Sequence, residues 1–427
     1  MSYGPPVATL SPNHTPPRRS VASWVTYDLA NTVFALGVGS LYFPTWMNEA
    51  GGSDTNLAVA LNIAMVVVIF LSPWIGAVGD YTGKRVRLLI PTTLVAITGT
   101  FFLGSVGLYP SLALFSVAII GFNLGGVPYD ALLPDVSTPA TRGRVSGLGV
   151  GIGYLGSAIA LVIGALLLDD FGYPAVFKAI AVAFLLFALP SFFWIEERPR
   201  PTAGIPRPTV GSIPRQFVGA WKRARSFPQV ARFLVGRFLY TDAINTMIGG
   251  FLAIYAKEDL KLTDAEIRSL LGISIVFSIA GGIGGGRLVD RFGPRRVLHS
   301  TLYLWVTTIV IAVAAGSNGL VYLAPYIGIG AGIALGLTWS SDRVYMTAIA
   351  PPQHLGEFYG LYAMVGRFAT LLGPLVWAIQ VDRFGWPRAT ALGSLALFVV
   401  AARVVLHKVD DGFSLREPFS TPAASGS

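Results

Sequence analysis

The sequence predicts an all-α integral membrane protein with twelve transmembrane helices, arranged as two six-helix bundles that are related by pseudo-symmetry. Three observations support this fold class. Hydrophobic residues make up 53% of the 427 residues and charged residues only 12%, and the mean hydropathy is +0.63; soluble domains usually contain about 25% charged residues. Twelve apolar runs are long enough to cross a bilayer. Polar motifs of the first six runs recur in order in the last six.

The composition excludes several classes of function. The chain contains no cysteine, so a disulfide, a thiolate metal site and a thiol nucleophile are all impossible. The net charge of +9 does not indicate a nucleic-acid partner, because no recognition motif accompanies it and membrane proteins gather cations on their cytoplasmic side. The histidines are far apart in the sequence, so we expect no metal site, and we expect no cofactor.

A membrane span needs about 20 mostly apolar residues, and this criterion divides the chain into five parts. We expect a disordered cytoplasmic tail over 1–21, a first six-helix bundle over 22–195, a basic, proline-rich cytoplasmic linker over 196–230, a second bundle over 231–408 and a cytoplasmic tail over 409–427. The expected spans are 22–46, 57–79, 88–108, 111–133, 146–168, 174–195, 232–255, 267–287, 297–315, 319–342, 357–380 and 386–407.

The distribution of lysine and arginine predicts the orientation of these spans. One side of the membrane receives most of the cations, including those of the linker, whereas the other side receives only Lys257, Lys261, Arg268, Arg383 and Arg388. The positive side of a multi-pass protein faces the cytoplasm, so we expect both termini inside. With no organelle signal in the sequence, a prokaryotic cytoplasmic membrane is the default location.

The two halves of the chain carry matching polar residues at a nearly constant separation. Six spans is an even number, so both halves enter the membrane from the same side. This predicts a parallel repeat whose axis runs along the membrane normal, with the substrate bound between the halves. The matches pair Asp28 with Asp242, Asn31 with Asn245, Gly76 with Gly286, Asp80 with Asp290 and Gly83 with Gly293.

Two short polar turns stand at equivalent places in the halves: GAVGDYTGKRVR from Gly76 to Arg87, and GGRLVDRFGPRR from Gly285 to Arg296. Their glycines permit a tight turn between spans. Helix ends carry unpaired backbone groups and partial charges, so an aspartate with cations at such a turn can hold the neighbouring bundle. We therefore expect a gate on the cytoplasmic side that includes Asp80, Lys84, Arg85, Arg87, Asp290 and Arg295.

The first turn, with its Gly76, Asp80, Gly83, Lys84, Arg85 and Arg87, resembles the loop motif of the major facilitator superfamily, and the second turn resembles its weaker partner. Within this superfamily, SWVTYDLANTVFA (23–35), PYDALLPDVSTPATRGRVSGLGVGIGYLGS (128–157), RFLYTDAINTMIGGFLAIYAKEDL (237–260) and FYGLYAMVGRFATLLGP (358–374) are similar to the vacuolar amino-acid effluxer (autophagy-type) family and its bacterial relatives.

This resemblance covers most of residues 22–405 and implies the major facilitator fold and solute export or efflux, with amino acids the best-known substrates of the fungal members. It also implies that an acid at the inner end of the fourth span pairs with the loop arginines, a role that fits Asp135 with Arg85 or Arg87. The chain departs from the pattern at Asp130, where asparagine is more usual, and in the fifth span, where no proline follows the glycines. The second departure weakens an assignment to drug:proton exchange.

Ionisable residues within the spans need an explanation, because each costs about 2.5–3.5 kcal/mol on insertion scales. Asp28 and Asn31 share one helix face, and Asp242 with Asn245 repeats this arrangement. In one interpretation these pairs face a central cavity and bind substrate or a proton. In the other they form hydrogen bonds between helices that only fix the packing.

Several charged residues lie in the cytoplasmic third of the spans, where they fit a gate as well as a binding site. For Asp130 and Asp135 we favour the gate. Arg343 is adjacent to Asp342 in the sequence, and we expect it to form either a local ion pair or an ion pair of the gate.

Arg367 differs from these groups because it lies roughly 16 Å along its span, near the middle of the bilayer. A guanidinium offers a planar fork of donors that suits a carboxylate or a phosphate; the alternative is a structural pair with an acid such as Asp342. Its counterpart in the repeat is Tyr154. Tyr154, Asn123 and Trp339 are candidates for the cavity wall, although for each of them a place in the packed core is the favoured interpretation.

Glycines are concentrated in the fifth and eighth spans. Residues 151–156, GIGYLG, match G-x-G-x-x-G, but they lie inside an expected span without a preceding strand, so they do not indicate a dinucleotide site. Glycines spaced four apart let helices approach closely. We expect these two spans to pack against each other across the boundary between the halves.

These features predict a secondary active transporter that moves a small polar solute by alternating access. Proton coupling is expected, because buried carboxylates are available and no nucleotide-binding loop exists. A zwitterionic amino acid would match Arg367 to its carboxylate and Asp28 or Asp242 to its ammonium, with export as the favoured direction. The alternatives are an effluxer of lipids or hydrophobic drugs and, more remotely, a non-transporting membrane scaffold. We expect no enzymatic activity, and a monomer in the lipid bilayer.

Overall fold

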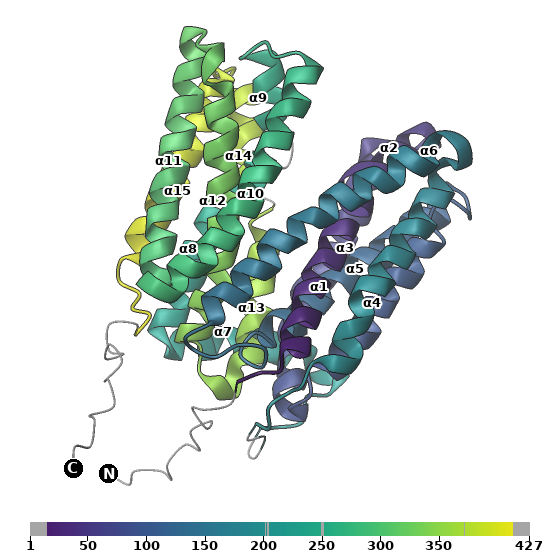
Figure 1. Ribbon diagram of the computed structural model, residues 1–427, viewed down its shortest axis with the longest axis vertical. Coiled ribbons are helices and arrows are strands. Elements are labelled where there is room, and N and C mark those ends of the chain that lie inside the picture. The colour runs from purple at the N-terminus through teal and green to yellow at the C-terminus, as the bar shows by residue number, and fades with distance from the viewer. Residues whose placement is uncertain (1–14, 201, 203–204, 249–251, 371, 413–427) are drawn as a thin grey trace, which may run out of the picture.

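The structure is a computed structural model, and it describes residues 15–200, 202, 205–248, 252–370 and 372–412. The expected tails fall on 1–14 and 413–427 for most of their length, and those residues lie outside the described part. The regular structure of the described residues is entirely helical. The helices form two groups that lie close together at the end where α1 (Arg18–Phe34) begins and α15 (Arg388–Leu406) ends, and spread apart toward the other end (Figure 1). These are called the near end and the far end.

The first group of helices encloses a buried apolar core that includes the fully buried Phe34, Phe43, Phe115 and Phe177. Its first helix begins four residues before the expected span. The group consists of α1, the π-helical η1 (Ala35–Tyr42), α2 (Phe43–Glu49), α3 (Asp54–Thr82), α4 (Val86–Phe101), α5 (Leu108–Ala131) and α6 (Arg142–Trp194).

The second group has a core of its own, with Phe233, Tyr345 and Phe358 fully buried. It consists of α8 (Pro228–Thr246), α9 (Leu252–Glu258), α10 (Asp264–Phe292), α11 (Pro294–Asn318), η4 (Val321–Leu323), α12 (Ala324–Ile349), η5 (Pro352–His354), α13 (Leu355–Phe368), α14 (Leu372–Ala378), η6 (Ile379–Arg383) and α15.

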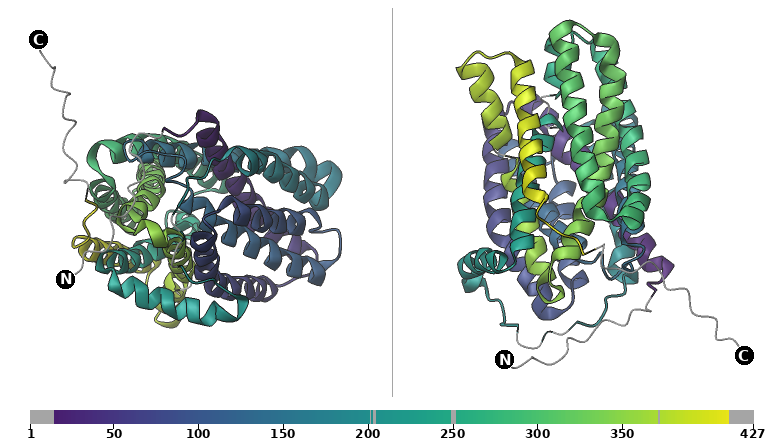
Figure 2. Two further views of the ribbon diagram at one scale, coloured as in Figure 1. Left: turned by 90° about the horizontal axis from the view of Figure 1, so that it is seen from below. Right: turned by 90° about the vertical axis from the view of Figure 1, so that its left-hand side faces the viewer.

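The linker between the groups contains the short η2 (Val210–Ser212) and an amphipathic helix, α7 (Ile213–Ser226). Helix α7 lies across the near end of the molecule (Figure 1, Figure 2). Its inner face buries Ala220 and Ala224, and Phe217 packs on Phe70 of α3 with ring centroids 5.0 Å apart. Ala220 and Ala224 belong to the core of the second group, and Arg223 lies 2.9 Å from Glu357 of α13. The helix therefore contacts both groups.

Eight of the described helices are long and apolar enough to cross a membrane. The count is lower than the twelve expected spans for local reasons. Helix α6 covers two expected spans, which meet at Gly172 with non-helical φ 71° and ψ 177°. Helix α4 has only 16 residues, α1 passes into η1, and the span expected over 232–255 contains residues 249–251, which lie outside the described part. The number twelve stays a prediction.

The polar turns of the two halves have the geometry that their glycines predict. Helix α3 ends at Gly83 with φ 64°, and α10 ends at Gly293 with φ 86°. Positive φ is readily available to glycine and costly for most other residues. The expected tight turns are therefore present in both copies.

The two groups touch through glycines at the near end. A Cβ on Gly147 of α6 would lie 2.4 Å from the carbonyl oxygen of Gly282 in α10, and one on Gly286 would lie 2.5 Å from that of Gly143. The expected close packing of the fifth and eighth spans is thus confirmed. Helices α3 and α13 repeat it, because a Cβ on Gly76 would lie 2.1 Å from the carbonyl oxygen of Gly356.

Candidate functional site

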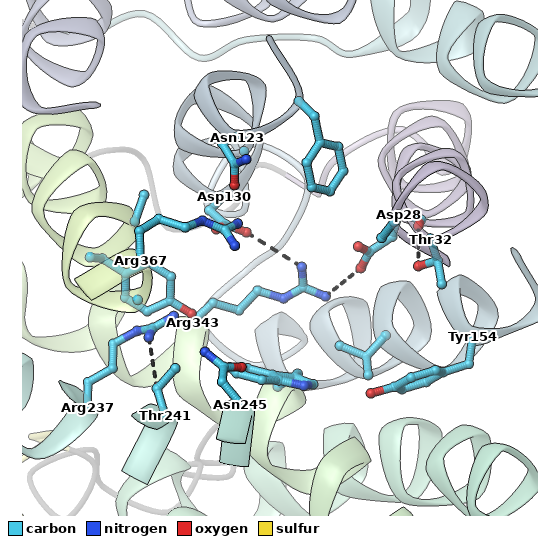
Figure 3. Close-up of a pocket in the computed structure, with 18 residues that line it drawn as sticks. Asp28, Thr32, Asn123, Asp130, Tyr154, Arg237, Thr241, Asn245, Arg343 and Arg367 are labelled. Carbon is cyan, nitrogen blue, oxygen red and sulfur yellow. Dashed lines mark hydrogen bonds and ion pairs between the residues drawn. The ribbon is translucent and has the colours of Figure 1, made fainter. Parts of the chain in front are cut away.

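A cavity of about 410 Å³ lies between the two groups of helices (Figure 3). Helices α1, α5 and α6 supply its wall on one side, and α8, α12 and α13 supply the other. Five of the lining side chains carry a formal charge. The lining consists of Asp28, Thr32, Ala35, Phe122, Asn123, Gly126, Asp130, Val150, Tyr154, Arg237, Thr241, Asn245, Trp339, Arg343, Tyr362, Ala363, Gly366 and Arg367.

Arg343 of α12 crosses the boundary between the groups and binds two acids of the first group (Figure 3). Its Nη2 lies 2.8 Å from Oδ2 of Asp28 in α1, and its Nη1 lies 3.6 Å from Oδ1 of Asp130 in α5. It also donates to the hydroxyl and the carbonyl of Ser146 in α6, at 2.8 and 2.9 Å. Its guanidinium stands 4.6 Å from the ring centre of Trp24. One cation therefore ties three helices of the first group to the second.

Asp342 faces away from this bridge, into the second group. Its carboxylate accepts hydrogen bonds from Tyr240 and Tyr362 and lies 3.3 Å from Nε of Arg237 in α8. The guanidinium of Arg237 stacks 3.5 Å from the ring centre of Tyr362. The structure thus pairs Asp342 with Arg237, and neither the expected local pair with Arg343 nor the alternative pair with Arg367 is formed.

Arg367 lies near the end of α13 and points into the cavity, close to Asp130 and Asn123 (Figure 3). Unlike the other two arginines of the lining, it forms no ion pair with any acid among the described residues. Arginine presents five donors in a rigid fork. The cavity therefore offers an uncompensated cation to a solute.

The remaining residues expected to bind substrate divide into two sets. Tyr154, Asn123, Asn245 and Trp339 line the cavity, and Asn31 lines a recess of about 240 Å³ beside it. Asp242 does not line either space. It is fully buried, and its Oδ1 accepts the backbone N–H of Gly373 at 2.8 Å.

Sequence reasoning did not single out Thr32, Thr241 and Tyr362 as lining residues. Thr32 follows Asp28 by four residues, and its hydroxyl donates to the backbone carbonyl of Asp28 at 3.0 Å. Thr241 likewise follows Arg237 by four residues, and its hydroxyl accepts a hydrogen bond from Nη1 of Arg237 at 3.0 Å. The spacing of four residues after a charged group was the available signal. Tyr362 carried no such signal, because its role depends on α8 of the same group.

The first polar turn holds the second group through a backbone contact. Asp80, at the end of α3, accepts the N–H groups of Gly356 and Glu357 at 2.8 and 2.9 Å, where α13 begins. It also lies 3.1 Å from Nη2 of Arg85. A carboxylate at a helix N-terminus satisfies free N–H groups and complements the helix dipole. Asp80 therefore has the position expected of a gate residue.

The second polar turn repeats this contact in the opposite sense. Asp290, at the end of α10, accepts the N–H groups of Gly143 and Arg144 at 2.6 and 3.0 Å, where α6 begins. Its Oδ2 lies 3.4 Å from Nε of Arg144. The two aspartates thus form a pair of pseudo-symmetric contacts between the groups, here called the near-end latches.

Arg85 supports the first latch from within. It is fully buried, donates to the carbonyl of Ala131 at 2.8 Å and lies 3.8 Å from Oδ2 of Asp135. Asp135 also pairs with Arg200 of the linker. Glu197 accepts the N–H groups of Arg85 and Val86, and its burial raises the pKa of its carboxyl above the usual value. The linker is therefore part of this cluster.

Not every expected gate residue lies between the groups. Lys84 and Arg87 are exposed. Arg295 instead holds the segment after α15: its N–H donates to Asp411 at 3.0 Å and its Nη2 donates to the carbonyl of His407 at 2.7 Å. Asp342 serves within the second group, as described above. One of these contacts is repeated in the first half, because the N–H of Arg85 donates to Glu197 after α6 as that of Arg295 donates to Asp411 after α15.

The family model of the Major Facilitator Superfamily matches residues 28–374 and, again, 238–423. The chain belongs to the major facilitator superfamily. The uncharacterized MFS-type transporter YxiO of Bacillus subtilis (strain 168) is 26% identical to it over 414 residues, which cover 91% of this chain and 94% of YxiO. Autophagy-related protein 22-1 of Penicillium rubens is 25% identical over 299 residues, 63% of this chain and 50% of that protein. The resemblance seen in the sequence is therefore confirmed.

Solved structures of major facilitator proteins share this fold. The human organic anion transporter MFSD10 (TETRAN) superposes with a TM-score of 0.71 over 92% of this chain and 100% of that chain, at 16% identity. Identity at this level establishes the fold alone. The chain is thus a multi-pass membrane protein of a transporter superfamily, with two helical groups around a charged cavity.

Proposed function

We propose that this major facilitator protein is a secondary active transporter that moves a small polar solute by alternating access. In this proposal twelve spans form two six-helix bundles, the chain is a monomer in a cytoplasmic membrane, and the near end with both termini faces the cytoplasm. The observation that carries the proposal is the Arg343 bridge, which joins the two groups across the cavity through Asp28 and Asp130. Rocking one group against the other must break it together with the latches.

Charge in the cavity favours a polar solute over a lipid or a hydrophobic drug. Five charged side chains surround about 410 Å³. An apolar molecule buried against them would desolvate Arg367, which has no ion pair among the described residues, without compensation. The volume fits a small molecule. We favour an amino acid whose carboxylate binds Arg367 and whose ammonium binds Asp28 or Asp130, exported from the cell.

A solute of this kind would also weaken the bridge. An ammonium group near Asp28 or Asp130 competes with Arg343, and a proton on either carboxylate removes its charge. Both events lower the free energy needed to separate the groups. This supports proton coupling as part of the proposal, with Asp28 as the first candidate for the proton site.

The test uses the full chain reconstituted in proteoliposomes, after a thermal-shift screen against amino acids, sugars, nucleosides and organic acids. We expect counterflow of an amino acid to fall at least tenfold in Arg367→Gln and to remain normal in Arg268→Gln, a matched change at an exposed arginine. Equal counterflow in the wild type and Arg367→Gln would overturn the role of Arg367. Absence of counterflow for every amino acid would overturn the substrate class.

Proton coupling has a separate test in the same vesicles. A pH gradient is expected to drive uptake in the wild type but not in Asp28→Asn, while counterflow without a gradient persists. Gradient-driven uptake that survives in Asp28→Asn would remove the proton role of Asp28.

A further inference from the structure

A second cavity, remote from the central one, lies at the near end on the outer side of the second group. It measures about 500 Å³ and lies where α10 and α15 end and α11 begins. Helices α11 and α15 run side by side on this flank of the molecule (Figure 1, Figure 2). Its lining contains three arginines and two histidines against two aspartates, and consists of Phe292, Arg295, Arg296, His299, Ser300, Arg403, His407, Asp410 and Asp411.

The two acids of this cavity are engaged by one of its three arginines. Arg295 donates its backbone N–H to Asp411 at 3.0 Å, and its Nη1 lies 3.9 Å from Oδ1 of Asp410. Arg296 and Arg403 form no ion pair with any described acid. The cavity therefore retains two arginines that have no described carboxylate within ion-pair distance.

Arg403 and His299 also present polar atoms without a partner. The Nε of Arg403 and the Nε2 of His299 are buried and have no hydrogen-bond partner among the described residues. Buried polar atoms normally find a partner, so these two atoms can bind a water molecule or a polar group of a ligand. Arg403 is held in place by stacking on Tyr303, at 4.1 Å from the ring centre. Its guanidinium is therefore positioned before any ligand arrives.

The outer surface of α11 and α15 is apolar between this cavity and the far end. Tyr303 and Val310 of α11 are 53% and 56% exposed, and Leu397 and Val400 of α15 are 69% and 44% exposed. In a membrane protein such a surface contacts acyl chains. A basic cavity at the rim of this strip lies where a phospholipid headgroup would sit above its own chains.

We propose that this cavity binds the phosphate group of an anionic phospholipid of the cytoplasmic leaflet, through Arg296 and Arg403. The acyl chains lie along Tyr303, Val310, Leu397 and Val400. Arginine suits a phosphate because it offers two parallel donors. The site is separate from the central cavity, so its ligand does not depend on the solute that the protein moves, and only the choice of leaflet rests on the orientation proposed above.

The test is native mass spectrometry of the full chain in detergent, with phosphatidylglycerol or phosphatidylcholine of identical acyl chains. We expect the wild type to retain phosphatidylglycerol in preference, and Arg296→Gln with Arg403→Gln to lower its affinity about 5-fold for each arginine removed. Arg268→Gln, an exposed arginine at the far end, is the control and should bind as the wild type does. If Arg403→Gln does not fold, the affinity for phosphatidylglycerol is measured with Arg296→Gln alone.

Three results would overturn the proposal. The first is equal retention of the two lipids by the wild type. The second is unchanged retention of phosphatidylglycerol in the arginine variants. The third is competition by millimolar inorganic phosphate that displaces the lipid completely, which would assign the cavity to a soluble phosphate compound.

Discussion

The first near-end latch gives the sharpest prediction. Asp80 of α3 accepts the N–H groups of Gly356 and Glu357 at 2.8 and 2.9 Å. When the near end opens, water replaces these two bonds, so only their excess strength over water counts. A hydrogen bond to a charged group contributes about 1.5–3 kcal/mol. Asp80→Asn keeps one acceptor oxygen and loses the charge. We therefore expect the closed state of the near end to lose about 2 kcal/mol of stability relative to the open state, which changes the ratio of the two populations roughly 30-fold.

The assay is pulsed electron-electron resonance between spin labels. The chain has no native cysteine, so Arg87→Cys in α4 and Arg291→Cys in α10, both exposed near-end sites, can be labelled without background. Asp80→Asn should move the distance distribution toward longer values. Asp169→Asn, which removes an exposed acid elsewhere in the first group, should leave it unchanged. A distribution in Asp80→Asn that matches the wild type would show that these two hydrogen bonds do not hold the near end closed.

Three further predictions concern packing, charge and pH. Gly286→Ala should destabilise the protein by about 1–3 kcal/mol through overpacking. Gly284→Ala, whose new Cβ would have nothing within 4 Å, should leave thermal unfolding unchanged. Equal melting temperatures of the two variants would contradict the close contact at Gly286. Arg237→Gln should cost about 3–5 kcal/mol by leaving Asp342 charged and buried, and adding Asp342→Asn should recover part of the lost melting temperature. Burial raises the pKa of Glu197, so the folded state holds the proton of this carboxyl more tightly than the unfolded state does. Stability therefore falls as the pH rises through the raised pKa. Glu197→Gln should flatten the pH dependence of stability, and a profile identical to that of the wild type would argue against this role.

Local chemistry explains what the sequence could predict. The turns at Gly83 and Gly293 depend on glycine at a positive φ, and a latch aspartate needs only to stand beside such a turn. Both features are encoded within a dozen residues. The close packing of α6 and α10 also follows from glycine spacing.

The partners of charged residues could not be predicted in the same way. Asp342 and Arg343 are neighbours in sequence, but successive residues of a helix point about 100° apart, because a turn takes 3.6 residues. One therefore faces Arg237 inside the second group, and the other crosses to Asp28. Arg295 and its counterpart Arg85 each donate the backbone N–H to an acid that follows the last helix of their half, Asp411 and Glu197. Their side chains differ, because that of Arg85 lies 3.1 Å from Asp80, whereas that of Arg295 donates to the carbonyl of His407 at 2.7 Å.

In the proposed mechanism the two groups rock about the cavity between them, and this motion changes the distances at both ends. It is tested most directly by measuring both ends of the molecule in lipid nanodiscs, with labels at Arg87→Cys and Arg291→Cys for the near end and at Ser105→Cys and Asn318→Cys, both exposed, for the far end. Addition of the transported solute with protons is predicted to lengthen the near-end distance and shorten the far-end distance together. Two distances that stay fixed, or that change in the same direction, would contradict the account.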